Sequence, residues 1–379
     1  MAESHKQSRK LKISIAVSII LSVSIILLIL YFTLDAATFQ QLATVPVRYE
    51  FFVAAVCFNA LFWLFWALRM KILAQAADPK LRLGYWESTK IVLANQFLAG
   101  ITPSMAGGEP VRVYLLNKDG LSVGGATAVV LGERLIDAII ILVSVPLAFF
   151  IIRPYLSYYP VSFTLFGVHI EFDVIMFALF TGIAFFLLCI ILLAYAIKNP
   201  EKVKRLLCRV SGWIGRRSKK KTESKLITRI GHEVDNFHDG IVYFLTKGKK
   251  SFLLATGCTV LMWCSGFMIG SMLLLGLGLP PFFAESFAAE ILLTLITMIP
   301  LTPGSSGVSE LSIAGFYSLL INSVPNSSFL IGVFVILFRF ITYHMNVLTG
   351  AVFQYRIFKS LTSLSLDAIE KKEEKPLCK

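Results

Sequence analysis

Charged residues are scarce in this sequence. Asp, Glu, Lys and Arg make up 16% of the 379 positions, whereas hydrophobic residues make up 56%. A soluble globular domain carries about 25% charged residues, so this composition excludes an ordinary soluble protein of this length. Mean hydropathy is +0.74, and repeated apolar runs approach the ~20 residues with which a helix crosses a bilayer. The sequence predicts an all-α polytopic membrane protein.

Several signatures of known chemistry are also absent. The six cysteines have neither disulfide-like nor metal-binding spacing, and we interpret them as small buried apolar residues. The sequence contains no Walker A motif, Rossmann fingerprint or nucleophile elbow. We therefore expect no metal, no cofactor, no catalytic residues and no ATP-driven transport by this chain alone, and we expect that it is not an enzyme.

Six apolar runs are predicted to be complete membrane spans, at 13–34, 51–74, 124–152, 172–197, 251–278 and 328–355. The first run has a basic flank but no small-residue cleavage site, so we interpret it as a retained span rather than a signal peptide. Two further apolar stretches, 87–117 and 284–322, are interrupted by Pro and Gly. Each is predicted to form two half-helices in a re-entrant hairpin.

Lys and Arg predict the orientation, because cytoplasmic loops are enriched in both. The N-terminus, the loop at 74–86, the segment 198–250 and the tail are basic, whereas 279–327 contains no Lys or Arg. We therefore expect cytoplasmic N- and C-termini in a cell membrane. Segment 198–250 contains fifteen basic and five acidic residues, a net +10. We interpret it as an amphipathic cytoplasmic segment beside anionic lipid headgroups, not as a nucleic-acid-binding site.

One phrase occurs twice, about 200 positions apart. A Thr-Pro at Thr102-Pro103 precedes Gly107-Gly108-Glu109, and a second at Thr302-Pro303 precedes Gly304-Ser305-Ser306-Gly307 and Glu310. The predicted orientation places the two hairpins on opposite sides of the membrane. We therefore predict an inverted repeat, with repeat 1 at about 51–152 and repeat 2 at about 251–355, within one transmembrane domain at 1–356 followed by a tail at 357–379.

Ionisable residues inside apolar segments suggest a function, because they are unfavourable in lipid. The candidates are Glu109, Arg112, Glu133, Arg134, Asp137, Glu290, Glu310, Arg339 and His344. Helical spacing places Glu109 and Arg112 on one face, and Glu133 and Asp137 on another. These residues could form internal ion pairs that only hold helices together. Alternatively, the arginines and the half-helix N-termini at the two phrases form an anion-binding site near the midplane, best matched by a lipid phosphate.

The sequence also resembles a known family. The resemblance rests on Asn95-Gln96-Phe97, on the Thr102-to-Arg112 run, on Gly132-Glu133-Arg134 with Asp137, and on Pro300-Leu301-Thr302-Pro303-Gly304 with Gly307-Val308 and Glu310. Together these motifs resemble the lysylphosphatidylglycerol synthase transmembrane (flippase-like) family, over residues 10–356. In the family's bifunctional members, the membrane part translocates aminoacylated phosphatidylglycerol, and a soluble C-terminal domain makes it.

Because the chain ends at Lys379, the resemblance implies a stand-alone lipid-translocation module without the synthase domain. Its substrate would be an anionic or aminoacylated phospholipid or a polyprenyl-phosphate lipid. We expect the two hairpins to hold the headgroup, Arg112, Arg134 and Arg339 to bind phosphate, and the carboxylates to pair with them or titrate. Three alternatives stay open: an ion-coupled small-solute transporter, a membrane-embedded enzyme acting on a lipid phosphate, and a non-catalytic membrane subunit. Membrane lipids are the expected partners, and a homo-oligomer also stays open.

Overall fold

The computed structural model describes residues 46–100, 108–158, 248–297 and 305–353, together with short stretches between 163 and 246. Within these residues four helices are long and apolar enough to cross a membrane: Tyr49–Ala77, Val123–Tyr155, Lys249–Gly276 and Leu330–Phe353. They coincide with four of the predicted spans, which are thereby confirmed as long apolar helices. The predicted span 13–34 and most of 172–197 lie outside the described residues.

The long helices begin and end where the sequence requires it. Helix α3 (Tyr49–Ala77) contains neither Gly nor Pro. It ends before Asp78-Pro79 because a residue that precedes proline disfavours the helical conformation. Helix α10 (Lys249–Gly276) is followed by Gly278, whose φ of 73° is in the left-handed region, and then by two prolines.

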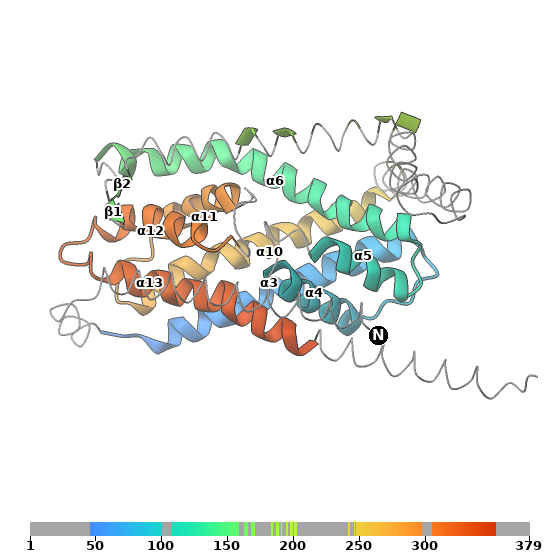
Figure 1. Cartoon of the computed structure of the whole chain (residues 1–379), viewed down its shortest axis with the longest axis horizontal. Helices are drawn as coiled ribbons and strands as arrows, with labels where there is room; N and C mark the ends of the chain where they lie inside the picture. The colour runs from blue at the N-terminus through green and yellow to red at the C-terminus, as the bar shows by residue number, and fades with distance from the viewer. Residues whose placement is uncertain are drawn as a thin grey trace, which may run out of the picture.

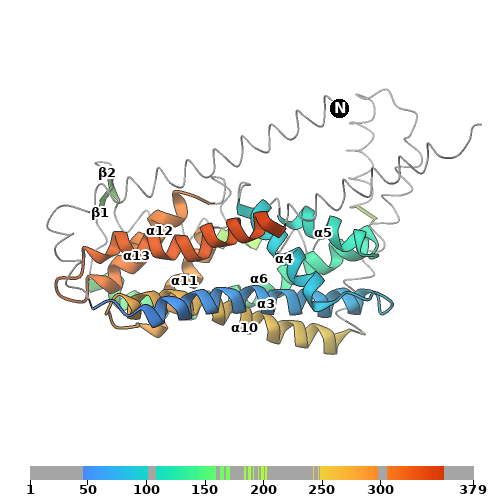
Figure 2. The same cartoon turned by 90° about the horizontal axis from the view of Figure 1, so that it is seen from below.

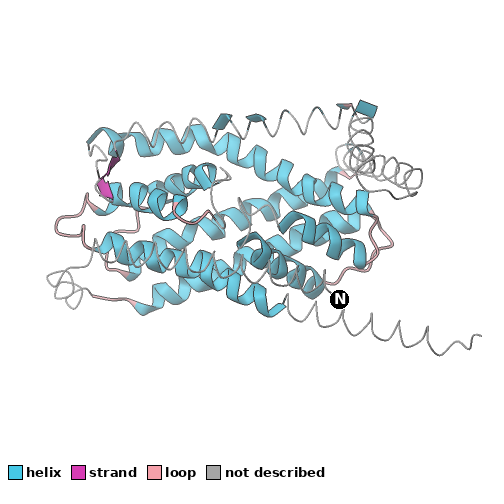
Figure 3. Cartoon of the chain, viewed as in Figure 1, coloured by secondary structure: helices cyan, strands magenta, loops and turns pink. Residues whose placement is uncertain are grey.

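Helix α6 (Val123–Tyr158) is longer than the predicted span 124–152, and it contains Pro146 and Pro154. Proline is tolerated inside membrane helices because neighbouring groups satisfy the backbone that it leaves unpaired. Beyond α6, strands β1 (Phe163–Leu165) and β2 (Val168–Ile170) pair antiparallel, with Thr164 opposite His169 (Figure 3). These short strands are the only ones in the described part of the chain. The helical fold class is therefore confirmed, with this small addition.

Four shorter helices lie between the long ones. They are α4 (Tyr85–Gly100), α5 (Gly108–Lys118), α11 (Phe283–Thr297) and α12 (Val308–Ile321). At 1.5 Å per residue they are roughly 17–24 Å long, which is less than the ~30 Å hydrocarbon core of a bilayer. The two Thr-Pro phrases fall between α4 and α5 and between α11 and α12, in residues 101–107 and 298–304, which lie outside the described residues.

Both halves of the chain share one order of elements. A long helix, two short helices and a long helix occur in α3 to α6, and again in α10 to α13. Helix α13 (Leu330–Arg339) continues through a π-helical turn, η1 (Phe340–His344), to Phe353. In Figure 1, α6 and α13 run along opposite sides of the bundle and in opposite directions.

Helices α3 and α10 form the most extensive contact between the halves and lie side by side (Figure 2), and α6 also packs against α11. Helices α3 and α10 are antiparallel, because the Arg48 amide at the start of α3 donates to the Gly276 carbonyl at the end of α10, at 3.0 Å. Glycine permits this close approach: a Cβ on Gly266 would lie 3.2 Å from the Phe62 ring. The Phe52 ring lies against Gly276 in the same way.

The buried apolar residues form two main clusters. One joins α3, α4 and α5 around residues such as Met70, Val92 and Leu116. The other joins α11, α12 and α13 around residues such as Leu292 and Phe316. Helix α6 contributes to both clusters, with Val129 and Ile136 in the first and Ile141 and Val145 in the second. The site described below lies where the two clusters meet.

Candidate functional site

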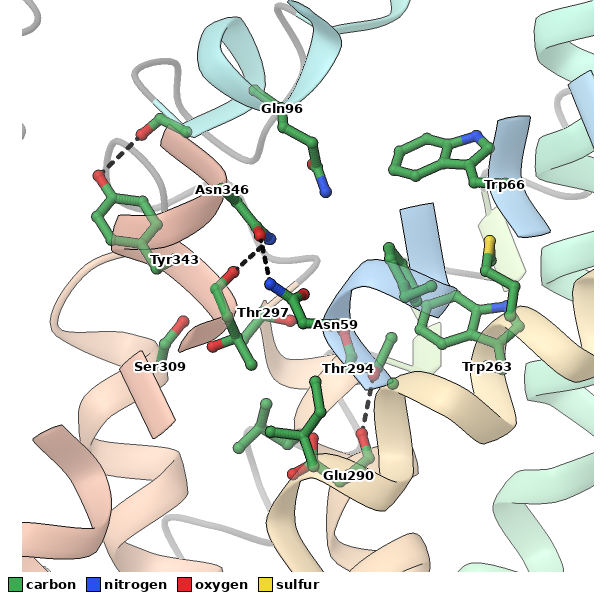
Figure 4. Close-up of a pocket in the computed structure, with 18 of the residues that line it drawn as sticks. Asn59, Trp66, Gln96, Trp263, Glu290, Thr294, Thr297, Ser309, Tyr343 and Asn346 are labelled. Carbon is green, nitrogen blue, oxygen red and sulfur yellow. Dashed lines mark hydrogen bonds between the residues drawn. The ribbon is translucent and has the colours of Figure 1, made fainter. Parts of the chain in front are cut away.

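A cavity of about 310 Å³ lies beside the middle of α3 and α10. Both halves of the chain contribute to its wall: α3, α4, α5 and α6 from the first, and α10, α11, α12 and α13 from the second. Figure 4 shows polar side chains of Asn59, Gln96, Glu290 and Asn346 on this wall, with the indole rings of Trp66 and Trp263 across from them. The cavity is therefore a mixed polar and aromatic chamber at mid-helix depth.

The ends of the short helices meet at this cavity. Gly100 and Glu109, on either side of residues 101–107, line it, and so do Thr297 and Ser309, on either side of residues 298–304. The phrase residues predicted for the site, Thr102, Pro103, Gly107, Thr302, Pro303 and Gly304, lie outside the described residues. The described helix ends on both sides of these residues nevertheless line one chamber.

A buried cluster of ions connects α3, α5 and α6. The Arg69 Nε donates to Glu133 at 3.1 Å, and its Nη1 donates to Asp137 at 2.6 Å and to the Thr259 hydroxyl at 3.2 Å. Arg112 donates to the other oxygen of Glu133. Glu133 and Asp137 thus share one face of α6, as their spacing predicted, and both reach the same arginine.

Trp66 covers the two arginines of this cluster. The guanidinium carbons of Arg69 and Arg112 lie 5.9 and 5.1 Å from its ring centroid, a distance at which an aromatic face attracts a cation. Both arginine side chains are fully buried. Arg112 is not among the residues that line the cavity, so the structure places it behind the wall, where it pairs with Glu133 and not with Glu109.

Arg134 is placed differently, although it is the next residue along α6. Its Nε lies 3.4 Å from Glu109, and its Nη1 lies 3.5 Å from Asp137. Neither contact has hydrogen-bond geometry, and the Nε has no hydrogen-bond partner among the described residues. Arg134 and Glu109 both line the cavity. The guanidinium of Arg134 therefore retains donors for a guest.

The second half contains a similar pair. The Arg339 Nε donates to Glu310 at 2.9 Å, its Nη2 donates to the Ser306 hydroxyl at 3.3 Å, and its guanidinium lies 4.2 Å from the Tyr343 ring centroid. Glu310 also accepts the Gly307 amide at 2.6 Å, which caps α12. Gly307 has a φ of 89°, a conformation that glycine adopts without strain.

Ser305 and Gly108 have structural positions at the helix ends. The Ser305 hydroxyl donates to the Thr297 carbonyl at 2.9 Å and so joins the start of α12 to the end of α11. Gly108 lies against Asn95 on α4, where any Cβ would overlap the amide side chain. Among the predicted site residues, these two shape the approach of the short helices and do not line the cavity.

The two arginine pairs occupy equivalent positions in the two halves. In each, an arginine of the last long helix contacts a glutamate in the first turn of the second short helix: Arg134 with Glu109, and Arg339 with Glu310. Their exposure differs. The side chains of Arg134 and Glu109 are 35% and 33% exposed, whereas those of Arg339 and Glu310 are 5% and 0% exposed. The first pair is thus open and the second is closed.

Sequence reasoning missed several residues around the cavity. Asn59 donates to the Ile341 carbonyl and to the Asn346 side chain, both at 2.9 Å. Ile341 lies in the π-helical turn, where widened pairing leaves a carbonyl available. Tyr343 donates to the Gly100 carbonyl at 3.0 Å. Arg69 and Asn59 could have been identified, because both are polar residues inside the predicted span 51–74.

The model of the lysylphosphatidylglycerol synthase transmembrane region matches residues 15–350. The chain belongs to this family. The match covers the eight helices from α3 to α13 in the described part of the chain, as far as the last turn of the final helix, and it confirms the resemblance seen in the sequence motifs. As a family member with four long apolar helices in its described part, the chain is a multi-pass integral membrane protein.

Two relatives within the family carry the name UPF0104 membrane protein. The one from Archaeoglobus fulgidus is 33% identical over 309 residues, which are 81% of this chain and 87% of the relative. The one from Methanothermobacter thermautotrophicus is 25% identical over 267 residues, which are 68% of this chain and 71% of the relative. Membership of the family is consistent with a role related to membrane lipids.

Proposed function

We propose that this protein is a translocase that moves a lipid with an anionic headgroup between the two leaflets of the cell membrane. The observation that carries the proposal is a cavity at mid-helix depth that is shared by both halves, with Arg134 beside Glu109 on one side and Arg339 beside Glu310 on the other. A binding site near the bilayer midplane, at the interface of two halves, is the arrangement found in many transporters.

The arginines favour a phosphate-bearing headgroup. A guanidinium presents a planar fork of donors that matches a phosphate in two places. Arg134 makes no hydrogen bond among the described residues and lies on the cavity wall, so it is the first candidate to hold the phosphate. Arg339 lines the same cavity from the opposite half. Arg112, fully buried behind the wall, takes a supporting role in this proposal.

The cavity has the size of a headgroup and not of a whole lipid. Its volume of about 310 Å³ is at the lower end of the 300–1,000 Å³ typical of ligand pockets. The acyl or polyprenyl chains would stay in the surrounding bilayer while the headgroup crosses. Anionic or aminoacylated phospholipids and polyprenyl phosphates all satisfy this requirement, because they combine a compact charged headgroup with long apolar chains.

We infer that the paired short helices are re-entrant hairpins within an inverted repeat. None of the four is long enough to cross a bilayer, and their inner ends line the cavity. The antiparallel contact of α3 and α10 and the equivalent arginine–glutamate pairs support a reversed relationship of the halves. Rocking of one half against the other would open the cavity alternately to each side.

The test is a leaflet-accessibility assay in proteoliposomes with fluorescent phosphatidylglycerol, lysyl-phosphatidylglycerol and a polyprenyl phosphate. Phosphatidylcholine, which has no net charge, is the comparison lipid. We expect the protein to accelerate movement of at least one anionic or aminoacylated lipid. Arg134→Gln should reduce that rate about tenfold or more, because it removes one charge-assisted contact worth about 1.5–3 kcal/mol. Lys118→Gln, which removes an exposed charge at the end of α5, is the matched control.

Mass spectrometry of the recovered lipid separates the alternatives. A translocase leaves the headgroup mass unchanged, whereas an enzyme acting on the lipid phosphate alters it. No movement of any lipid in the panel by the wild-type protein, or a wild-type rate in Arg134→Gln, would overturn the corresponding part of the proposal: the function in the first case, and the headgroup site in the second.

A further inference from the structure

Glu290 differs from the other acidic residues at the cavity. It lies on α11, lines the cavity, and is 5% exposed. Its side chain accepts one hydrogen bond, from the Tyr317 hydroxyl at 2.7 Å. No Lys, Arg or His of the described residues lies within ion-pair distance of it. It is a buried carboxyl group with a neutral partner only.

The remaining charges of the site balance one another without Glu290. In the first half, Arg69, Arg112 and Arg134 face Glu109, Glu133 and Asp137. In the second half, Arg339 faces Glu310. An ionised Glu290 would therefore give the site one uncompensated negative charge. A neutral Glu290 leaves the described charges around the cavity balanced.

This balance links Glu290 to the binding of an anion. A negative charge in a poorly solvated site is unfavourable without a partner, and such a group takes up a proton instead. A second negative charge entering the same cavity increases that penalty, because like charges repel strongly where the dielectric constant is low. An anionic headgroup and an ionised Glu290 thus exclude each other, whereas an anionic headgroup and a protonated Glu290 are compatible.

Hydroxyl groups hold the carboxyl group in place. Tyr317 on α12 contacts the Ser286 hydroxyl at 2.8 Å as well as Glu290. Both hydroxyls lie against Gly270 of α10, where any Cβ would overlap the Tyr317 oxygen. This arrangement fixes one carboxyl oxygen and leaves the other for the proton. The glycine is required for the close approach, so α10, α11 and α12 together build the position.

We propose that Glu290 is the proton-binding site of this transporter, taking up one proton with each anionic headgroup and releasing it on the other side. This inference rests on the proposed function and adds its coupling ion. The step forms one O–H bond on the Glu290 carboxylate and breaks it after transfer. Charged or titratable groups face Glu290 or its cavity from the neighbouring helices: Arg69 on α3, Glu109 on α5, Arg134 and Asp137 on α6, Tyr317 on α12, Arg339 on α13 and Tyr343 on η1. All the charged ones are already paired.

Helix α10, which also packs against α11, brings no charged residue to the cavity: beyond Lys249 and Lys250 at its start it contains none. At the far end of α11, Glu285 accepts a hydrogen bond from Tyr155 at 3.1 Å and does not line the cavity. Glu285→Gln is therefore a matched control for Glu290→Gln. Both replace a carboxyl group by an amide of the same shape on the same helix.

The first test is transport of fluorescent phosphatidylglycerol in proteoliposomes with an imposed pH gradient. Lipid movement by the wild-type and Glu285→Gln proteins should be several-fold faster when the gradient drives protons in the direction of lipid movement. Glu290→Gln, whose amide is permanently neutral, should move lipid at one rate with and without the gradient. Size-exclusion elution identical to wild type checks that each variant is folded.

The second test detects the protonated form of the Glu290 carboxyl group by chemical modification. Dicyclohexylcarbodiimide adds to a protonated carboxylic acid, and the adduct rearranges to a stable N-acylurea without loss of any atom. Peptide mass spectrometry should find this adduct at Glu290 near neutral pH, with less at alkaline pH, and not at the ion-paired Glu310 or Glu133. If wild-type lipid movement did not depend on the pH gradient and Glu290 were not modified, the proposed proton site would be overturned, but the proposed translocase function would not. No lipid movement at all would overturn both.

Discussion

Glu133 and Arg134 are consecutive on α6, yet their replacement should have opposite consequences. Glu133 accepts hydrogen bonds from both Arg69 and Arg112, and all three side chains are fully buried. In Glu133→Gln, the amide oxygen can still serve one arginine, but the amide nitrogen presents a donor to the other. One buried guanidinium then loses its counter-charge where water cannot replace it.

Removing one partner of a buried ion pair costs about 3–5 kcal/mol, a large part of the 5–15 kcal/mol that stabilises a typical folded domain. We expect Glu133→Gln to lower the free energy of unfolding by about that amount. Arg134→Gln breaks two longer contacts of a side chain that is 35% exposed, so it should cost about 0–1 kcal/mol. The first variant should therefore lose stability, and the second should lose only transport.

Tryptophan fluorescence during denaturation in detergent micelles is a suitable assay, since Trp66 lies against the two buried arginines. A double-mutant cycle of Glu133→Gln with Arg112→Gln should give a coupling energy above about 1 kcal/mol, because the two residues interact directly. A Glu133→Gln protein as stable as wild type, or an Arg134→Gln protein destabilised to the same degree, would refute this division of roles.

Three further substitutions test other contacts. Gly266→Val should destabilise the α3–α10 contact by about 1–3 kcal/mol through overpacking against Phe62. Gly257→Val is the control, because nothing lies within 4 Å of its Cβ position. The denaturation midpoint should fall in the first variant and not in the second. Asn59→Leu should cost about 1–3 kcal/mol, because the Ile341 carbonyl loses its buried donor; unchanged stability would argue against that bond. Tyr343→Phe should lower the free energy of unfolding by about 0.5–1.5 kcal/mol through loss of the bond to the Gly100 carbonyl, and an equal midpoint for variant and wild type would contradict it.

Much of the fold could be predicted from the sequence, because apolar runs of membrane length are rarely anything but helices. The spans at 51–74 and 251–278 are examples, and the breaks at the Thr-Pro phrases agree with the helix ends at Gly100 and Thr297. The shared face of Glu133 and Asp137 was also predictable, because it depends only on helical periodicity.

The choice of ionic partners could not be predicted. Glu109 and Arg112 are three residues apart, yet each pairs with a residue of α6 instead, because tertiary packing offers a better-placed partner. Arg69 lies near the predicted cytoplasmic end of its span, where an arginine normally reaches water. Only the packing of α3 against α6 and α10 shows that this side chain is fully buried.

If the two halves form the proposed inverted repeat, the unequal exposure of the two arginine–glutamate pairs has a further consequence. The geometry around Arg134 and Glu109 then serves as a template for Arg339 and Glu310 after the cavity turns to the opposite leaflet. On the proposed transport cycle, the open pair in one half and the closed pair in the other would then represent the two end states, and each half would adopt its counterpart's arrangement in the next step.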